Sequence, residues 1–406
     1  MSNEVKMMID LKKDPYGKYN GNELEYVSQV LNSDNRKDNE LPWTQRFEKK
    51  FCEVMGVQYA VTCNSGTSGL HSAIVAAGVQ PGDEVICPGL AVIMDAYAII
   101  HANGVPVFTD VNRNTQTIDP EDIEKKITSK TKAIIVVSLQ GLPADMDPIM
   151  KIADKNKLVV IEDSAQTMLG KYRGRLAGTL GHIGVFSFEN KKHITSGSEG
   201  GMIVTDDEHL AKRARKFAGI GYKHLTSTTG RTSLALSTVQ DPNYERFDSI
   251  GLNYRMNEVS AAVGLAQLER VEVLVERRRE VAALFREAVG KCSWLVEQNI
   301  PEHYVHSHYT FSVQYFGNEA LGLSWKEFYN RYLEMGGDGF YSACKVLYLE
   351  PFLKEFEING SRYNRGLCPI AEEIQPRIMQ FKTNYRNLDV AKQKAQILKN
   401  LISSLS

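Results

Sequence analysis

Short apolar runs that alternate with helical patterns limit the folds open to this chain more than any other sequence feature. Helical patterns, such as those at residues 120–127 and 147–155, lie between most of these runs. Continuously apolar strands that alternate with helices are typical of a mostly parallel sheet. We therefore predict an α/β fold with a central sheet. Its predicted strands include residues 85–87, 105–108, 133–137 and 158–161.

A long helical pattern at residues 259–289 is expected to lead into a second part of the chain. Its block 276–280 holds three arginines between two glutamates, and interleaved charges of this kind indicate a solvated helix face. We predict a large domain at residues 1–265. Residues 266–406 then form the long linking helix and a small C-terminal α+β domain. The strand and helices expected there are residues 309–313, 325–335 and 389–401.

Composition and charge exclude several kinds of function. The formal net charge of −1 gives no field that would attract nucleic acid or an acidic membrane surface. The six cysteines include no CxxC pair, so neither a zinc ribbon nor a disulfide framework is expected. His303, His306 and His308 lie close together but lack a further ligand cluster, so we expect no metal site. The longest apolar stretch, residues 91–100, is too short to span a bilayer. We expect a cytoplasmic protein with no nucleic-acid or membrane partner.

The turn Asn64-Ser65-Gly66-Thr67-Ser68 connects a short predicted strand to a helical pattern. A turn of this kind directs free backbone N–H groups and the positive end of the helix dipole at one point, which favours an anion. It lacks the lysine of a P-loop and the three-glycine spacing of a dinucleotide site, so a single phosphate monoester suits it better. Simple capping of the helix by serine or threonine explains the pattern equally well.

Two polar stretches follow predicted strands, and ligands of parallel sheets bind beyond the carboxyl ends of the strands. Asp163 follows the run at residues 158–161, and a carboxylate buried there needs a partner. It either caps the next helix or pairs with a cationic ligand atom. The loop at residues 187–201 contains Lys191 and Lys192. It is either a surface turn or the position of an amine nucleophile with a lowered pKa.

Together, these stretches resemble the DegT/DnrJ/EryC1/StrS sugar aminotransferases, a branch of the fold-type I enzymes that use pyridoxal 5'-phosphate (PLP). The resemblance covers about residues 15–400, and it is specific because all the pieces occur in order. The matching pieces are residues 64–68, 143–147, 162–166, 187–188 followed by Lys192, and 253–256.

The resemblance implies a role for individual residues. Lys192 would form a Schiff base with PLP, with pyridoxamine phosphate as the intermediate of the reaction. Asp163 would pair with the pyridine nitrogen and keep it protonated. Gln166 would contact the ring, and Asn253 would reach the phosphate of the partner subunit, which implies a homodimer with shared active sites. The expected catalytic residues are Lys192 and Asp163. The expected cofactor-binding residues are Ser65, Gly66, Thr67, Ser68, Val92, Asp163, Gln166, Ser187, Lys192 and Asn253.

The chain departs from the family pattern in three places. Val92 stands where the family carries an aromatic residue against the cofactor ring, so the stacking contribution of an aromatic is lost. The glycine-rich stretch at residues 196–201 is one residue longer than usual, and the segment at residues 222–251 is also long. The family spacing selects Lys192 over Lys191, which we expect to be solvated because neighbours in an extended segment point in opposite directions.

The expected function is transfer of an amino group from glutamate or glutamine to a keto sugar, nucleotide-linked or phosphorylated, in amino-sugar biosynthesis. Three alternatives stay open. The family includes PLP- or pyridoxamine-phosphate-dependent sugar dehydratases, whose loop reads His-His-Ile-Thr where this chain has Lys192-His193-Ile194-Thr195. It also includes aminotransferases for cyclic ketones of the inosose type. A regulator that binds PLP without turnover is the third.

Overall fold

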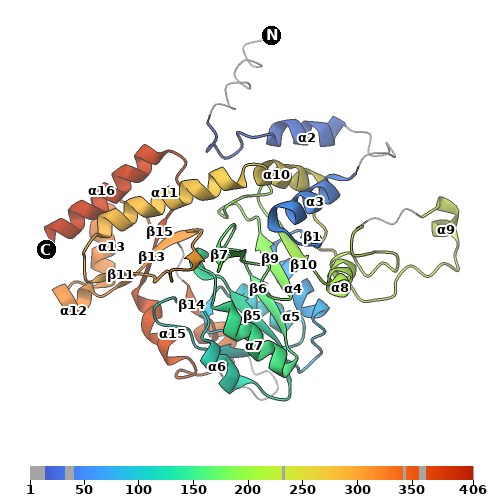
Figure 1. Ribbon diagram of the computed structural model, residues 1–406, viewed down its shortest axis with the longest axis horizontal. Helices are drawn as coiled ribbons and strands as arrows, with labels where there is room; N and C mark the ends of the chain where they lie inside the picture. The colour runs from blue at the N-terminus through green and yellow to red at the C-terminus, as the bar shows by residue number, and fades with distance from the viewer. Residues whose placement is uncertain (1–13, 33–40, 231–233, 342–343, 356–362, 406) are drawn as a thin grey trace, which may run out of the picture.

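The computed structural model of the chain describes residues 14–32, 41–230, 234–341, 344–355 and 363–405. Its central strands are β1 (Tyr59–Cys63), β2 (Glu84–Pro88), β4 (Val105–Thr109), β5 (Thr131–Val137), β6 (Val159–Asp163), β9 (Ile183–Ser187) and β10 (Gly201–Thr205). They form one seven-stranded sheet in the order β1-β10-β9-β6-β5-β2-β4 (Figure 1). The strands from β9 to β4 in this order are parallel, whereas β10 runs antiparallel to both of its neighbours. The predicted mostly parallel sheet is confirmed.

Helices cover both faces of this sheet. They are α3 (Trp43–Met55), α4 (Gly66–Ala76), α5 (Met94–His101), α6 (Pro120–Lys126), α7 (Met146–Asn156), α8 (Glu208–Ala218) and α10 (Glu258–Leu268). Val85 and Ile135 pack with α4, α5 and α8, whereas their neighbours Ile86 and Ile134 pack with α6 and α7. Helices α3 and α10 continue the second layer over β9 and β10. Because successive residues of a strand face opposite sides, strands buried on both faces are apolar throughout, which explains the runs in the sequence.

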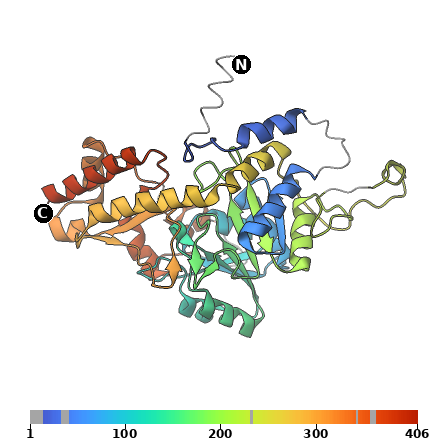
Figure 2. The ribbon, with the colours of Figure 1, turned by 45° about the horizontal axis from the view of Figure 1, so that its top comes forward.

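A smaller unit follows at the C-terminal end. It contains α11 (Val271–Val289), β11 (Leu295–Glu297), β13 (Thr310–Tyr315), α12 (Gly317–Leu321), α13 (Trp325–Glu334), β15 (Ile378–Lys382) and α16 (Leu388–Ser404). Its three strands form an antiparallel sheet in the order β11-β13-β15, with α11, α13 and α16 contributing to its own apolar core. Figures 1 and 2 show α11 running from the large part of the molecule along this unit. The predicted long helix is thus present but breaks between α10 and α11. The predicted boundary at residue 265 falls inside α10, and the division into two domains stays a prediction.

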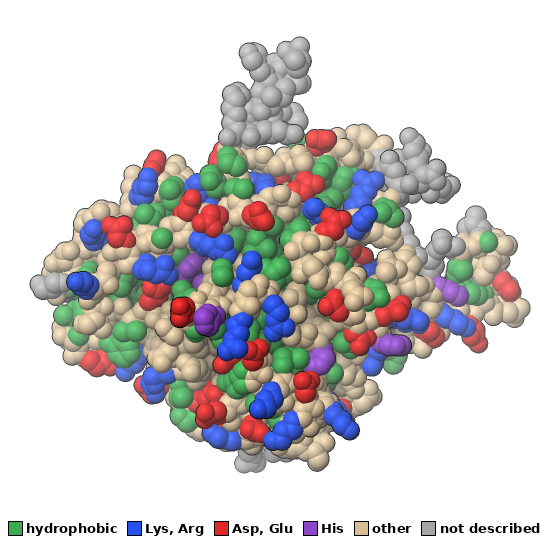
Figure 3. Space-filling model, in the orientation of Figure 1, with side chains coloured by type: hydrophobic (Ala, Val, Ile, Leu, Met, Phe, Trp, Pro, Cys, Tyr) green, Lys and Arg blue, Asp and Glu red, His purple; other side chains and the backbone are tan. Residues whose placement is uncertain are grey.

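The remaining elements are short. They are α2 (Glu23–Asn32), β3 (Leu90–Ala91), β7 (Lys171–Tyr172), β8 (Arg175–Leu176), α9 (Leu236–Gln240), β12 (Tyr304–Val305), β14 (Lys345–Val346), α14 (Pro351–Glu355), α15 (Pro369–Ile374) and the 3₁₀ turns Leu139–Gly141, Leu347–Leu349 and Gln375–Arg377. Among the described residues, no helix is both long enough and apolar enough to cross a membrane. On the face drawn in Figure 3, acidic and basic side chains are interspersed.

The segment after α8, which is long in the sequence, projects from the body of the molecule as an arm that carries α9 (Figures 1 and 2). Its two sides meet at the bridge between Tyr222 and Phe247, whose rings stack with centroids 4.8 Å apart. His224 and Tyr244 stack further out at 5.6 Å. Ile250, where the arm returns to the body, is 89% exposed. The arm therefore exposes apolar side chains where it returns to the body of the molecule.

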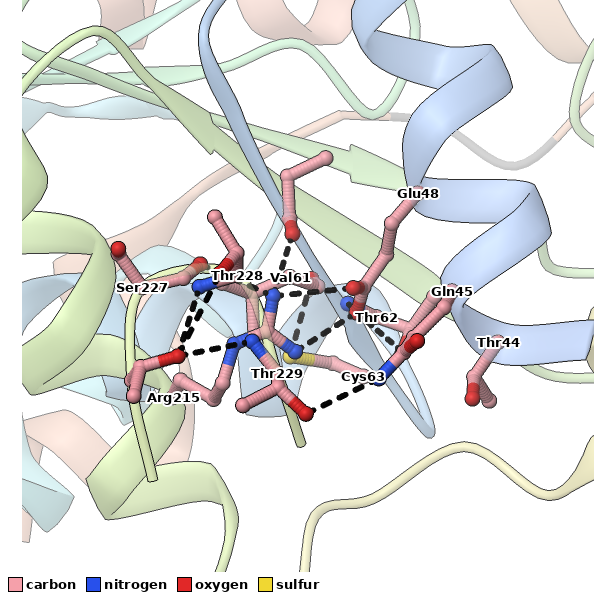
Figure 4. A network of polar contacts seen from close by, with 12 residues as sticks. Thr44, Gln45, Glu48, Val61, Thr62, Cys63, Arg215, Ser227, Thr228 and Thr229 are labelled. Carbon is pink, nitrogen blue, oxygen red and sulfur yellow. Dashed lines mark hydrogen bonds and ion pairs between the residues drawn. The ribbon is translucent and has the colours of Figure 1, made fainter. Parts of the chain in front are cut away.

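A buried ion pair fixes the root of this arm to the sheet (Figure 4). Arg215 of α8 donates two hydrogen bonds of 2.9 Å to the carboxylate of Glu48 on α3. It also donates to the carbonyl oxygens of Ala60 at 2.8 Å and Ser227 at 3.2 Å. Glu48 accepts two more bonds, from the backbone N–H of Thr62 at 2.8 Å and from its hydroxyl at 2.9 Å. The network joins two helices, strand β1 and the arm.

We expect Glu48→Gln to destabilise the protein by about 3–5 kcal/mol, because it leaves the buried Arg215 guanidinium without its counter-charge. The matched control is Glu53→Gln on the same helix, because the ion pair of Glu53 with Lys50 is largely solvent-exposed and contributes little. Urea unfolding followed by circular dichroism measures both. Equal unfolding midpoints for the two variants would contradict the expectation.

Candidate active site

Two of the residues singled out in the sequence meet at the carboxyl edge of the sheet. Asp163 is the last residue of β6, and its register partner is Val185 on the parallel strand β9. The loop that follows β9 brings Lys192 back toward this edge, close enough for Asp163 to raise the pKa of its amine. Side chains beyond neighbouring parallel strands converge, which is why both residues reach one place.

The environment of Lys192 suits an amine nucleophile. Burial lowers the pKa of its amine, and the nearby carboxylates of Asp163 and Glu189 offset part of that effect. Its Nζ lies 4.7 Å from the centre of the Tyr309 ring. Lys191, in contrast, is exposed. Of the two lysines, Lys192 is therefore the one placed beside Asp163, and its lowered pKa increases the neutral, nucleophilic fraction.

A buried arginine holds this loop in place, and the sequence analysis missed it. Arg278 of α11 donates from Nη2 to the carbonyl oxygens of Lys191 at 2.7 Å and Lys192 at 2.8 Å. From Nη1 it donates to the carbonyl oxygen of Tyr309 at 3.0 Å. The interpretation of residues 276–280 as a solvated face is therefore wrong for Arg278, which is only 6% exposed. The helical spacing shows the reason, because Arg278 continues the buried stripe of Val271 and Val275.

The start of α4 forms a cradle next to the lysine loop. Ser65 caps the helix, accepting a bond from the backbone N–H of Ser68 at 3.1 Å, while Ser68 Oγ accepts from the backbone N–H of Ser65 at 3.1 Å. A Cβ atom at Gly66 would stand 2.9 Å from Cβ of Ser187, and one at Gly201 only 2.4 Å from the carbonyl oxygen of Ser65. Glycine is therefore required where β9, β10 and α4 meet, at the end of α4 where the first backbone N–H groups lack partners within the helix.

Three hydroxyls among the expected cofactor-binding residues, those of Thr67, Ser68 and Ser187, differ in their environment. Ser68 Oγ is buried and donates to Oδ1 of Asn64 at 2.7 Å, so it is already committed to the turn. Thr67 is partly exposed and stands in the first turn of α4. Ser187 Oγ accepts a bond from the backbone N–H of Glu189 at 3.3 Å and keeps its own proton for a ligand. Thr67 and Ser187 are therefore the better candidates for an anion.

The other expected site residues lie at the same edge or on the surface. Gln166 is buried, and its Oε1 accepts a bond of 2.7 Å from the backbone N–H of Gln140. Val92 is half-buried between β3 and α5. Asn253 is exposed at the root of the arm, where it bridges to Gly219. An exposed position is what a contact with a second subunit would require.

His306 and His308, two of the three histidines noted in the sequence, pack against each other. The rings of His306 and His308 stack with centroids 4.0 Å apart. Nδ1 of His306 accepts a bond of 2.8 Å from the backbone N–H of His308, and its Nε2 lies 3.1 Å from Oε1 of Gln298. Within the described ranges, no group of three or more His, Cys, Asp or Glu side chains is placed to hold a metal ion.

Comparison with known proteins decides the family. Residues 18–390 match the DegT/DnrJ/EryC1/StrS aminotransferase family. The chain belongs to this family. The GDP-perosamine synthase of Escherichia coli O157:H7 is 42% identical over 272 residues, which cover 66% of this chain and 69% of that protein. The GDP-perosamine synthase of Caulobacter vibrioides is 38% identical over 279 residues, covering 67% of this chain and 68% of that protein.

Solved structures of DegT/DnrJ/EryC1/StrS enzymes share the fold. The aminotransferase from Psychrobacter cryohalolentis superposes with a TM-score of 0.83 and 29% identity, covering 94% of this chain and 97% of that one. DesV of S. venezuelae, in complex with a ketimine intermediate, superposes with a TM-score of 0.80 and 25% identity over 94% of both chains. The predicted fold class and membership are confirmed, and the chain is a PLP-dependent aminotransferase of the sugar aminotransferase family.

The residues at the sheet edge fit this cofactor. The glycine-walled cradle suits a phosphate monoester, and it lies against Ser187, where the loop that carries Lys192 begins. Asp163 is buried at 2% exposure, and its Oδ1 accepts a bond of 2.9 Å from the backbone N–H of Ala165. A buried carboxylate of this kind needs a cationic partner, and a protonated ring nitrogen would be one.

Proposed function

We propose that this aminotransferase moves an amino group from glutamate or glutamine to the ketone of a nucleotide-linked sugar, and that a GDP-linked keto sugar is the first substrate to test. The observation that carries the proposal is the placement of Lys192 beside Asp163, next to the cradle at the start of α4. The names of the two GDP-perosamine synthases, with which the chain shares 42% and 38% identity, support the choice of nucleotide.

Each residue of the site has a task in this reaction. PLP, when bound, supplies an aldehyde that takes up the amino group and a ring that withdraws electrons. The helix start at Ser65–Thr67 would bind the phosphate, and Asp163 would hold a proton on the ring nitrogen. Lys192 would bind the cofactor covalently and, once released, carry a proton between the carbon atoms of substrate and cofactor. Arg278 would keep the Lys192 loop in position through its two carbonyl contacts.

The surroundings of Lys192 support an anionic substrate. A cavity of about 70 Å³ borders Lys192 and is lined by several cations. Cations that line such a small cavity favour a small anionic group, such as a carboxylate of the amino-acid donor. The four basic side chains beside Lys192 are Lys18, Arg277, Arg278 and Arg386.

Mass spectrometry of the products tests the proposal. The protein with PLP is incubated with glutamate or glutamine and a panel of keto sugars linked to GDP, UDP or dTDP, together with a sugar phosphate and an inosose-type ketone. We expect an amino sugar and the oxo acid of the donor to form together. Loss of water from the sugar without amination would favour the dehydratase, and absence of any oxo acid would favour the regulator.

The cradle at α4 gives a second expected result. Thr67→Ala should weaken PLP binding by about 1.5–3 kcal/mol, because a charge-assisted hydrogen bond to the phosphate is lost. The control is Ser72→Ala one turn further along α4, since its hydroxyl donates only to the carbonyl oxygen of Ser68 at 2.7 Å. Equilibrium dialysis of PLP measures both variants. Equal affinities would show that the phosphate binds elsewhere.

The proposed functional unit is a cytoplasmic homodimer whose sites are shared. Asn253 supports this because it is exposed and bridges to Gly219, directly after α8. In a mixed dimer, one Lys192→Ala subunit and one Asn253→Ala subunit would create one doubly impaired site and one intact site. About half of the activity should therefore remain. A fully active monomer in sedimentation would contradict the shared site.

A further inference from the structure

A second carboxyl group lies in the interior beside Asp163. Asp95 stands in the first turn of α5 and is 0% exposed. Across the described part of the chain, neither of its side-chain oxygens finds a hydrogen-bond donor. An ionised carboxylate that is buried without donors is strongly disfavoured, because it loses its hydration and gains nothing in return. The proposed reaction gives Asp95 no role.

The groups around Asp95 show where a proton must sit. Asp163 acts most strongly on Asp95, both as a hydrogen-bond partner and through its charge, and Lys192 and the Cys87 thiol of β2 are the other titratable groups that interact with Asp95. Two carboxylates only accept hydrogen bonds, so a bond between them forms only when one carries a proton. Asp163 already accepts the backbone N–H of Ala165 at 2.9 Å, which stabilises its charge, whereas Asp95 has no donor. The proton therefore belongs on Asp95.

The electrostatics of the site agree with this assignment. Burial, followed by the charge of Asp163, raises the pKa of Asp95 well above its usual value, and the opposing effect of Lys192 is smaller. The N-terminus of α5 favours an anion only weakly, and this effect is smaller than the penalty for burying an unpaired carboxylate. The histidines of α4 and α5, His71 and His101, pair with each other at the opposite end of α5.

We propose that Asp95 is a positioning residue of the cofactor site, which stays protonated at neutral pH and donates its carboxyl proton to Asp163. The bond keeps Asp163 ionised and fixes the direction of its carboxylate. The pair then carries one negative charge, which matches one protonated ring nitrogen, whereas two ionised carboxylates would leave a surplus charge in the interior. The part that concerns the ring nitrogen rests on the proposed function. The part that concerns the proton on Asp95 does not.

Difference infrared spectroscopy of the cofactor-free full-length chain at neutral pH tests the proton. A protonated carboxyl group absorbs infrared light at a different frequency from a carboxylate. We expect the band of the protonated group to disappear in Asp95→Asn. The control is Glu162→Gln, which should leave the band in place. Glu162 is equally buried, but its oxygens accept three backbone N–H bonds, from Gly178, Leu180 and Gly181. A band that survives in Asp95→Asn would show that Asp95 is ionised and would overturn the proposal.

PLP binding tests the positioning role. In Asp95→Asn the amide still donates to Asp163, so we expect the PLP dissociation constant to stay within about twofold of the unmodified chain. In Asp95→Leu, of similar size but without a donor, we expect it to rise about tenfold or more. Equal weakening in both variants, or none in either, would overturn the positioning role. If the unmodified chain itself does not bind PLP, the proposed function fails, while the infrared band still decides the protonation of Asp95.

Discussion

Replacement of Lys192 by alanine should greatly slow transamination and leave PLP bound only non-covalently. The variant loses the amine that attaches the cofactor and the group that carries the proton, so we expect the rate to fall by about 100-fold to 10,000-fold. Borohydride reduction of the unmodified chain should remove the visible absorption of the bound cofactor. Peptide mapping should then find the reduced adduct on Lys192, which faces Asp163, and not on the exposed Lys191.

Lys191→Ala is the matched control, and we expect it to keep most of the activity. Lys192→His separates the two enzyme functions, because histidine still acts as a base but cannot attach the cofactor. It should retain added pyridoxamine phosphate and turn over no amino donor. A reduced adduct on Lys191, or normal transamination by Lys192→Ala, would show that the loop has been assigned in the wrong register.

The sequence could predict the features that depend on a local pattern, namely the apolar strands and the polar residues that directly follow them. Apolar runs identified β5 and β6 because both faces of these strands are buried, and parallel strands bring their carboxyl ends to one edge. Asp163 and the lysine loop both follow such strands, so their convergence followed from topology alone. The choice of Lys192 came from the family spacing and stays a prediction, although Lys192 is less exposed than Lys191 in the structure.

The parts that the sequence did not predict depend on contacts between distant segments. Arg278 resembles its solvated neighbours in composition, and its burial follows from packing of α11 against the lysine loop 86 residues away. Asp95 lies within the apolar stretch at residues 91–100, which the sequence analysis considered only for its length. Its proximity to Asp163 arises because α5 follows β2, and β2 lies two strands from β6. Neither the burial of Arg278 nor the proximity of Asp95 to Asp163 can be predicted from a local sequence pattern.

Asp163→Asn is the other variant with a large expected effect. We expect it to fold and to bind some PLP, because the cradle at α4 is unchanged, but to lose activity by about 100-fold or more, as for the removal of a preorganised electrostatic group. An amide does not hold a proton on the ring nitrogen, so the ring withdraws electrons less well. Glu162→Gln, at the preceding residue of β6, is the control for disturbance of the strand.

PLP affinity and the rate of the half-reaction with glutamate, measured together, separate a chemical role of Asp163 from a structural one. If Asp163 acts on the ring nitrogen, PLP affinity should fall modestly while the rate of the half-reaction with glutamate falls far more. If Asp163 only supports the fold, thermal stability and PLP affinity should fall together, and the rate per bound cofactor should stay near that of the unmodified chain. Activity of Asp163→Asn within a few-fold of the unmodified chain would remove Asp163 from the mechanism. It would also leave the proton of Asp95 without a catalytic purpose, because the role proposed for Asp95 operates only through the carboxylate of Asp163.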